Sequence, residues 1–311
     1  MLYAFIKIPV RLALRIFCKN IHTAPSGAYR HQGPLLIVSN HPDSFLDAVI
    51  IGSRFSRPVH FLARGDAFTI PRHRKLLGWL NMVPVYRLSE GKENLGLNEY
   101  AFRRCREILE AKGIVLIFIE GICVNSHVLQ PFRKGAARIA WENRNLAGFS
   151  VVPLGIAYSN LRGIGKSVNL SAGDILQAQS LFPYPEEPKN MRYFNNRMLE
   201  QLQPLIQVPP PSPGNNKTTR TWLSVPAVLG YMTHILPYTV IRNIVSPKTA
   251  GTVFYDSVLF AALLLIYPLY LLLIGLCLYF CGVPFLYIIV VLAILPFLAM
   301  AAIHRKKWKL Q

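Results

Sequence analysis

Acidic residues are scarce in this chain, and the scarcity limits the classes to which it can belong. Its 311 residues include 15 Asp and Glu against 34 Lys and Arg, a formal net charge of +19, and only 16% are charged. Soluble domains usually carry about a quarter charged residues. Intrinsic disorder is excluded because 52% of the residues are hydrophobic, enough to form a core. The high hydrophobic fraction, together with the excess of basic over acidic residues, favours a protein that works at a membrane.

Cysteine is also sparse, and its spacing argues against structural metal or disulfides. None of the five cysteines forms a CxxC pair: Cys18, Cys105, Cys123, Cys277 and Cys281. An even disulfide framework and a zinc site both need more regular spacing. We therefore predict free thiols in a reducing compartment, no metal ion and no cofactor.

The sequence lacks the nucleophile motif of serine hydrolases and a complete phosphate-binding loop. No G-x-S-x-G occurs, so a serine hydrolase of the common α/β type would lack its nucleophile. Gly165-Lys166-Ser167 ends like a phosphate-binding loop, but the first glycine of that motif would fall on Asn160. Cys123 could be proposed as a thiol nucleophile, although a buried structural cysteine is the commoner case.

Basic residues recur at every fourth position near the start of the chain. Lys7, Arg11, Arg15 and Lys19 share one face of a helix predicted over residues 1–20, and apolar residues fill the rest. This pattern is typical of a helix that lies on an anionic membrane surface. The alternative is a terminal helix packed against its own domain.

No formally charged residue lies between Ser257 and Ile303. Cys281-Gly282-Val283-Pro284 divides this stretch into two halves, each with the ~20 residues that a membrane crossing needs. We predict a transmembrane hairpin with a basic tail over 256–311. Lys and Arg flank the hairpin but are absent from its turn, which by the positive-inside rule places both ends on the cytoplasmic face.

The middle of the chain alternates short apolar runs with longer amphipathic ones. Strands are predicted at 35–38, 59–63, 83–86, 114–119 and 151–156, with an edge strand at 167–170, and helices at 93–112 and 190–206. This alternation predicts an α/β domain over 21–206, with a largely parallel central sheet flanked by helices. Residues 207–255 then form a proline-rich linker and an interfacial or core helical segment.

The strongest local signal is Asn40-His41-Pro42-Asp43-Ser44-Phe45-Leu46-Asp47, directly after an apolar strand. α/β proteins place reactive groups at the carboxyl ends of strands. A nearby carboxylate can fix the imidazole tautomer, which makes His41 a candidate general base. The alternative is a helix cap in which Asp43 and Ser44 satisfy backbone donors, but a cap does not explain the histidine.

Four blocks in this order resemble the glycerolipid acyltransferase family, which includes lysophosphatidate and glycerol-3-phosphate acyltransferases. The four are Asn40-His41 with Asp47, Gly78 to Arg87, Ile117 to Gly121, and Val152-Pro153-Leu154. The resemblance implies that His41 deprotonates the acceptor hydroxyl and that Asp47 orients it. It also implies that Arg87 binds the acceptor phosphate and that Glu120 and Gly121 form part of the acceptor-binding wall.

This chain departs from the family pattern in two places. Five residues separate His41 from Asp47 where the family usually has four, so Asp43 is a rival partner for the histidine. The third block usually continues Glu-Gly-Thr-Arg-Ser, whereas Glu120-Gly121 is followed here by Ile122-Cys123-Val124-Asn125. The phosphate contact of that arginine must come from elsewhere; the nearest candidates are Arg133, Lys134 and Arg138.

The resemblance implies an O-acyltransferase that moves a fatty acyl chain from an acyl-CoA or acyl-carrier-protein thioester to a glycerophosphate acceptor. The favoured acceptor is 1-acylglycerol-3-phosphate, and glycerol-3-phosphate or another lysolipid, including an amino-acid-derived one, is the alternative. A lipid-binding scaffold without turnover remains open because of the unusual third block. The basic clusters favour anionic lipid over nucleic acid, since nucleic-acid binding gives no reason for a transmembrane hairpin.

Overall fold

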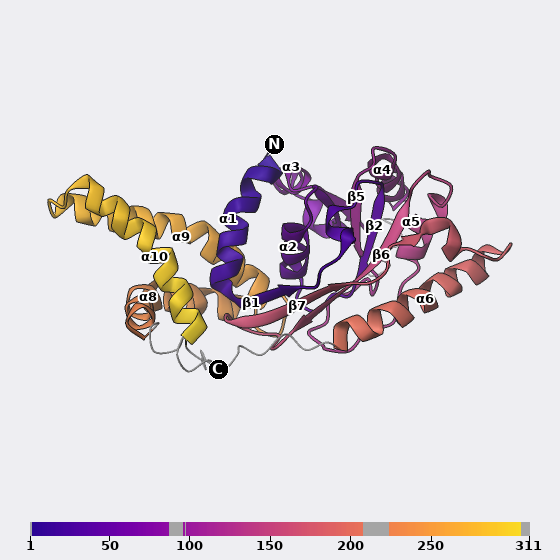
Figure 1. The fold of residues 1–311 in the computed structure, drawn as a ribbon. Coiled ribbons are helices and arrows are strands. Elements are labelled where there is room, and N and C mark those ends of the chain that lie inside the picture. Colours follow the sequence, from indigo (N-terminus) through magenta and orange to yellow (C-terminus); the bar gives the residue numbers. More distant parts are fainter. Residues whose placement is uncertain (1, 87–95, 97, 208–223, 306–311) are drawn as a thin grey trace.

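A single twisted sheet organises the chain (Figure 1). The computed structural model describes residues 2–86, 96, 98–207 and 224–305. Within them the sheet has eight strands in the order β1-β7-β6-β2-β5-β3-β4, with β8 paired to β6. The strands are β1 (Cys18–Thr23), β2 (Leu35–Ser39), β3 (Val59–Arg64), β4 (Met82–Val85), β5 (Ile114–Phe118), β6 (Ser150–Tyr158), β7 (Lys166–Ala172) and β8 (Leu176–Gln177).

The predicted largely parallel sheet is confirmed. From β6 through β2, β5 and β3 to β4 every pair in the path is parallel, whereas β7 pairs antiparallel with β6 and parallel with β1. The predicted edge strand at 167–170 lies inside the sheet, because β1 pairs with the outer side of β7. The sequence indicated a helix up to residue 20, but the amide of Gly165 bonds to the Phe17 carbonyl and the chain continues from Cys18 as a strand.

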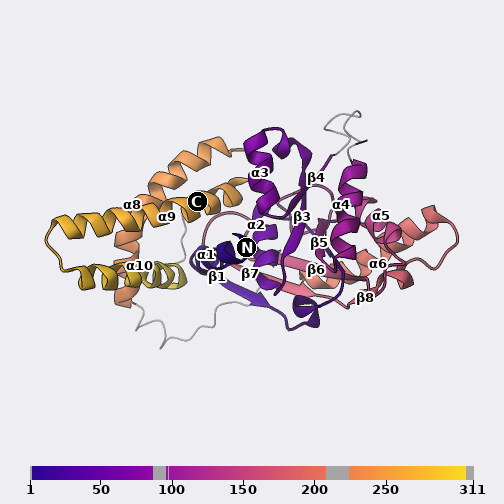
Figure 2. The same ribbon diagram turned by 90° about the horizontal axis from the view of Figure 1, so that it is seen from above.

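Helices cover both faces of the sheet (Figures 1 and 2). Alternate residues of β2 point to opposite faces, as in any strand. Leu35 and Ile37 pack with α1, α2, α8 and α9, while Leu36 and Val38 pack with α4, α5 and α6. The helices are α1 (Leu2–Phe17), α2 (Phe45–Arg54), α3 (Pro71–Trp79), α4 (Asn98–Glu110), α5 (Gly135–Glu142), α6 (Glu187–Gln207), α8 (Ser224–Lys248), α9 (Tyr255–Phe280) and α10 (Phe285–Arg305); short 3-10 turns are η1 (Gly27–Arg30), η2 (Gly65–Phe68) and η5 (Ala178–Leu181).

The basic side chains of α1 are partly used within the domain. Lys7 Nζ donates to the Phe55 carbonyl, and Arg11 Nε donates to the Ser53 carbonyl at 2.8 Å. These carbonyls lie at the C-terminal end of α2, where cations are favoured by the helix dipole. The predicted basic stripe therefore does not face lipid as one unit. Contact of α1 with a membrane stays a prediction.

Two helices, α9 and residues 285–304 of α10, are long and apolar enough to cross a membrane in the part of the chain that is described. They form a hairpin-like pair that projects away from the sheet (Figures 1 and 2). Apolar side chains cover its outer surface, as a lipid environment requires. The first turns of α9 differ, because Leu259 and Phe260 are buried in the domain core and Phe260 packs edge-on against Phe17.

The segment predicted to be interfacial or core helical contains α8, which packs closely on α10. A Cβ atom at Gly230 would lie 1.9 Å from the Leu298 carbonyl oxygen, so only glycine allows this approach. Other apolar side chains of α8 are exposed: Val225, Val228, Leu229, Met232, Leu236, Val240 and Ile244. Residues 208–223 of the predicted linker lie outside the described residues.

Candidate active site

The carboxyl ends of three adjacent strands meet beside His41. Ser39 of β2 is in register with Phe118 of β5 and with Leu154 of β6. Since these strands are parallel, the residues that follow them lie at one edge of the sheet. The first, third and fourth sequence blocks are therefore brought together by the sheet itself.

His41 and Asp47 are in direct contact. His41 Nδ1 lies 2.8 Å from Asp47 Oδ2, and the Asp43 backbone N–H donates to the same oxygen at 2.8 Å. The Tyr158 hydroxyl donates to Asp47 Oδ1 at 2.6 Å. The aspartate is fully buried, whereas the histidine side chain is 15% exposed. Bonding of Nδ1 to a carboxylate leaves Nε2 with its lone pair, as a general base requires.

The imidazole is also held by its ring face. Its plane stacks on the Phe118 ring with centroids 3.7 Å apart and an angle of 5° between the planes. Phe118 is the last residue of β5, so the sheet fixes the orientation of the ring as well as its position. A base held this way needs little reorganisation before it takes a proton.

The backbone conformation of Ser44 accommodates the additional residue between His41 and Asp47. Its backbone has φ 51° and ψ −138°, a region that non-glycine residues rarely adopt. Directly after it α2 begins, and Asp47 lies in the first turn of that helix. This turn shortens the path from His41, so that Asp47 still reaches the imidazole across a five-residue spacing. Of the two partners left open by the sequence, the imidazole bonds to Asp47.

Glu120 stabilises the turn that contains His41 through hydrogen bonds to its backbone. Its Oε2 accepts the His41 backbone N–H at 3.1 Å and its Oε1 accepts the Gln130 backbone N–H at 3.0 Å. Burial raises the pKa of this carboxyl more than the two backbone hydrogen bonds lower it. Gly121 has φ 65°, and a Cβ there would lie 2.8 Å from Arg133 Cγ, so this position favours glycine.

The segment that replaces the usual third-block continuation lies over the His41 turn. The Val124 N–H donates to the His41 carbonyl at 3.3 Å, and Asn125 Nδ2 donates to the Pro42 carbonyl at 2.7 Å. Cys123 Sγ accepts the Ser44 N–H at 3.0 Å. Burial raises the pKa of the Cys123 thiol to about 12. A protonated thiol is a poor nucleophile, which argues against the thiol mechanism.

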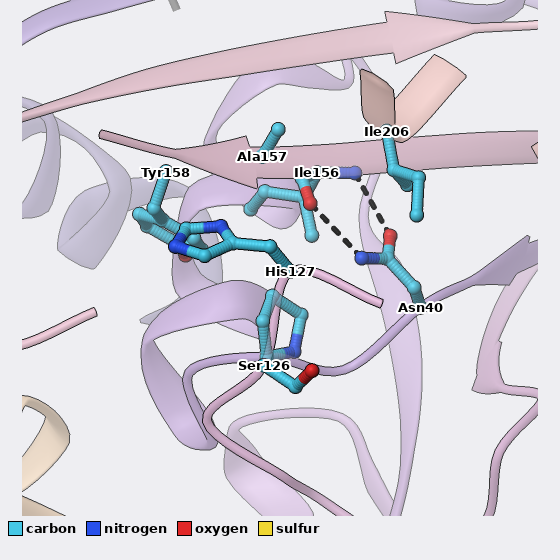
Figure 3. Close-up of a pocket in the computed structure, with 8 residues that line it drawn as sticks. Asn40, Ser126, His127, Ile156, Ala157, Tyr158 and Ile206 are labelled. Atoms are coloured by element: carbon cyan, nitrogen blue, oxygen red, sulfur yellow. Dashed lines mark hydrogen bonds between the residues drawn. The ribbon is translucent and has the colours of Figure 1, made fainter. Parts of the chain in front are cut away.

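A small pocket opens beside the first block (Figure 3). Asn40 forms two hydrogen bonds with the backbone of Ile156, both 2.9 Å long, and thereby ties the end of β2 to β6. His127 and Tyr158 also line this pocket (Figure 3). Sequence reasoning had assigned no role to Asn40 or His127.

The sequence predicts Arg87, Lys134 and Arg138 as ligands of the acceptor phosphate. Arg87 lies outside the described residues. Lys134 is exposed at the N-terminal end of α5. Arg138 Nε donates to Glu142 at 2.8 Å, and its guanidinium lies 4.3 Å from the centre of the Phe102 ring. The contacts of Arg138 are thus with α4 and α5, and not with the turn that carries His41.

Tyr158 is a site residue that the sequence did not reveal. It follows the fourth block by four residues, at the last position of β6. The available signal was the predicted largely parallel sheet, in which residues at the carboxyl ends of strands lie along one edge; Tyr158 comes two residues after the strand predicted at 151–156. Among the described residues, no group of three or more His, Cys, Asp or Glu is arranged to hold a metal ion.

Comparison with known proteins finds a family whose model matches the part of the chain that contains this site. Residues 15–157 match the model of the Acyltransferase family, and they include both partners of the His41–Asp47 pair. This part of the chain is similar to acyltransferase domains. Its predicted resemblance to that family is therefore confirmed for a little under half of the chain.

Curated relatives match the same part of the chain. The chloroplastic 1-acyl-sn-glycerol-3-phosphate acyltransferase BAT2 of Brassica napus is 30% identical over 147 residues, which is 46% of this chain and 37% of that protein. Lyso-ornithine lipid O-acyltransferase of Brucella abortus (strain 2308) is 30% identical over 158 residues, 50% of this chain and 55% of that protein. The chain thus spans about a third to a half of the length of these relatives.

The fold is also similar to a solved structure. The 1-acyl-sn-glycerophosphate acyltransferase PlsC from Thermotoga maritima superimposes with a TM-score of 0.45 and 18% sequence identity. The match covers 64% of this chain and 79% of the PlsC chain.

Proposed function

We propose that this protein is an O-acyltransferase that moves a fatty acyl chain from an acyl thioester to the free hydroxyl of 1-acylglycerol-3-phosphate. The observation that carries the proposal is the bond between His41 Nδ1 and the buried Asp47, in a domain of the Acyltransferase family. In this pair Nε2 accepts the hydroxyl proton while the oxygen attacks the thioester carbonyl. Such general-base catalysis accelerates a reaction by about 10²- to 10⁴-fold.

Asp47 stabilises the imidazolium that forms during this step. It is fully buried, so its interaction with the protonated ring is weakly screened by solvent. Collapse of the tetrahedral intermediate expels the thiolate, which takes up the proton, and leaves an ester. The acyl chain passes directly from donor to acceptor, since no step needs a covalent enzyme intermediate.

Arg87 is the proposed ligand of the acceptor phosphate. A guanidinium binds a phosphomonoester with two parallel hydrogen bonds, which would fix the acceptor hydroxyl relative to His41. Lys134, at the start of α5, is the second proposed phosphate ligand. The structure leaves Arg138 a weaker candidate because Glu142 already pairs with it. Glu120 and Gly121 keep their proposed place in the acceptor-binding wall, and Glu120 would support its shape through the backbone of His41 and Gln130.

The decisive experiment is an acceptor panel with the full-length protein in phospholipid nanodiscs. Labelled acyl-CoA and acyl-carrier-protein thioesters are offered with lysophosphatidate, glycerol-3-phosphate, other lysolipids or lyso-ornithine lipid. We expect diacyl product from lysophosphatidate with the native protein and none with His41→Ala. His22→Ala is the matched control, because His22 is an exposed residue of β1. Full activity of His41→Ala would overturn the mechanism.

A second candidate is acyl transfer to an acceptor without a phosphate. Two observations favour it: the third block lacks the usual arginine, and one relative is named a lyso-ornithine lipid acyltransferase. Arg87→Ala separates the two acceptors. A phosphate acceptor should show a large rise in KM, whereas an acceptor without phosphate should tolerate the change. A scaffold without turnover would bind lysolipid but give no product in either case.

The membrane arrangement is also a proposal. Residues 256–311 would anchor the protein, with the acyltransferase domain of residues 21–206 on the cytoplasmic face. The support is the pair of apolar helices together with the Lys and Arg residues on both sides of it. Labelling of the native Cys281, which is exposed at the turn, in sealed right-side-out vesicles tests this orientation, with Cys281→Ala as the control. Labelling should occur from outside, without permeabilisation.

A further inference from the structure

A buried lysine joins the His41 turn to the membrane hairpin. Lys166 Nζ is 2.5 Å from Asp43 Oδ2 and also bonds to Asp256 Oδ2, and all three side chains are at most 1% exposed. Asp43 lies in the turn between His41 and Asp47, Lys166 begins β7, and Asp256 lies in the first turn of α9. Three segments far apart in the sequence therefore share one ionic cluster.

The arrangement needs an explanation because burying charges is unfavourable. Each buried ion loses several kcal/mol of hydration, which only good geometry recovers. Burial alone would lower the pKa of Lys166, but the two carboxylates outweigh it and raise that pKa, so the lysine is charged. Its Nζ also lies 4.9 Å from the centre of the Tyr158 ring. The proposed proton transfer uses neither this lysine nor Asp256.

A second contact from α9 reaches the same turn. Ser257 Oγ accepts the Leu46 backbone N–H at 2.9 Å and donates to the Asp43 carbonyl at 3.3 Å. Leu46 precedes Asp47 directly, and the Asp43 N–H is one of the donors to Asp47 Oδ2. The first turn of α9 thus holds the residues on both sides of Ser44, where the backbone is strained.

We infer that Asp256 and Ser257 of α9 are positioning residues for the acyl transfer reaction, and that they act with Lys166 by holding the Asp43–Asp47 turn in the shape that aligns Asp47 with His41. The hairpin is then part of the active-site scaffold as well as a membrane anchor. This inference rests on the proposed acyltransferase activity. It assigns a catalytic consequence to residues outside the 15–157 family match.

The test compares Asp256→Asn and Ser257→Ala with the native full-length protein in nanodiscs. Asp256→Asn leaves Asp43 as the carboxyl partner of Lys166. Removing the Asp256 charge, which helps to raise the pKa of Asp43, lets Asp43 ionise at lower pH and neutralise the lysine, so the variant should fold. Ser257→Ala removes one hydroxyl from a helix. The matched controls are Glu107→Gln, which removes an exposed carboxylate paired with Arg104, and Ser180→Ala, which removes an exposed hydroxyl bonded to Gln177. Folded protein is quantified for every variant by its thermal unfolding amplitude.

We expect kcat per folded molecule to fall about 10- to 100-fold in both α9 variants, as small misplacements of catalytic groups do, with the KM for acyl donor unchanged. An unchanged KM for acyl donor separates misalignment of the base from a loss of donor binding, because a loss of donor binding would raise KM.

Ser257→Thr, which restores the hydroxyl, should recover most of the lost kcat. The inference is overturned if Asp256→Asn and Ser257→Ala keep native kcat per folded molecule. Absence of product from the native protein would instead reject the proposed acyltransferase function. The two failures are therefore distinguishable.

Discussion

The Tyr158 hydroxyl donates to Asp47 Oδ1 at 2.6 Å, and Oδ1 is the carboxylate oxygen that does not bond to His41. The two residues are 111 positions apart and both are buried. Burial and the adjacent carboxylate raise the pKa of Tyr158, so the phenol keeps its proton and acts as a donor. Three donors therefore occupy three of the about four acceptor sites of the Asp47 carboxylate, which fixes its rotamer.

Tyr158→Phe should lower kcat about tenfold and leave the protein folded. The change removes a hydrogen bond to a charged group without altering the shape of the ring, and such bonds contribute about 1.5–3 kcal/mol. Steady-state kinetics with lysophosphatidate measures the effect. Tyr100→Phe is the control, since Tyr100 is 49% exposed on α4. Equal kcat in both variants would show that the hydrogen bond from Tyr158 to Asp47 Oδ1 does not contribute to catalysis.

Gly121→Ala should reduce both stability and activity. The residue would have to hold φ 65° with a side chain, which costs about 1–2 kcal/mol, and its Cβ would press against Arg133 Cγ. Gly148→Ala is a matched control because Gly148 has φ 71° and open space around the added atom. Chemical unfolding in micelles compares the two.

The difference between these two glycine variants isolates the contact with Arg133. We expect Gly121→Ala to be destabilised more than Gly148→Ala and to lose acyl transfer in addition. If Gly148→Ala loses as much activity as Gly121→Ala, the effect comes from general destabilisation and the shape of the Glu120–Gly121 turn is irrelevant to catalysis.

Asp43 should make stability fall as pH rises. Burial raises the pKa of its carboxyl to about 8, although Lys166 opposes the shift, whereas the unfolded chain titrates near pH 3.9. Between these values the folded state binds more protons than the unfolded state, so stability is lost as pH increases. The loss of folding stability that Asp43 causes should extend from about pH 4 to about pH 8.

Asp43→Asn should remove that contribution. Thermal midpoints of the native and variant proteins in micelles at pH 5 and pH 8 measure it, and the native protein should lose more stability than the variant over this interval. Asp174→Asn, which changes an exposed residue, should leave the pH dependence as it is. Parallel pH dependence of native protein and Asp43→Asn would mean that Asp43 stays ionised throughout the interval.

The sheet could be predicted where strands are buried on both faces. Residues 35–38, 114–119 and 151–156 are continuous apolar runs, and they form β2, β5 and β6 in the parallel arrangement that alternation with helices indicates. β1 was missed because its sequence, CKNIHT, is short and polar, and because the basic stripe continues into it as far as Lys19. Its strand conformation depends on pairing with β7, 148 residues further on in the first matched pair, Cys18 and Lys166.

Part of the site could be predicted because its residues lie in short motifs that can be recognised in the sequence. His41, Asp47 and Glu120 lie in local motifs, and their side chains or backbones are in contact. Tyr158, Lys166, Asp256 and Ser257 reach the His41 turn only through tertiary structure, across as many as 214 positions in the bond from Ser257 to Asp43. No spacing rule links such distant positions in one sequence. The strain at Ser44 was hidden too, since only coordinates give φ.

The outer face of the hairpin should be in contact with lipid. Leu269 on α9 is 63% exposed, in a helix with a mean hydropathy of 2.5. Replacing it by lysine would place a charge in the hydrocarbon, which costs about 2.5–3.5 kcal/mol near the centre of a membrane helix. Leu269→Lys should therefore reduce the fraction of protein that resists alkaline carbonate extraction from membranes.

Leu199→Lys provides the matched control for this effect. Leu199 is 44% exposed on α6, which packs on β6 in the α/β domain, so the same substitution there adds a charge to a surface in contact with water. We expect Leu199→Lys to remain in membranes like the native protein. Equal retention of both variants would contradict the membrane hairpin, because a lysine on a lipid-facing surface and one on a wetted surface differ by several kcal/mol.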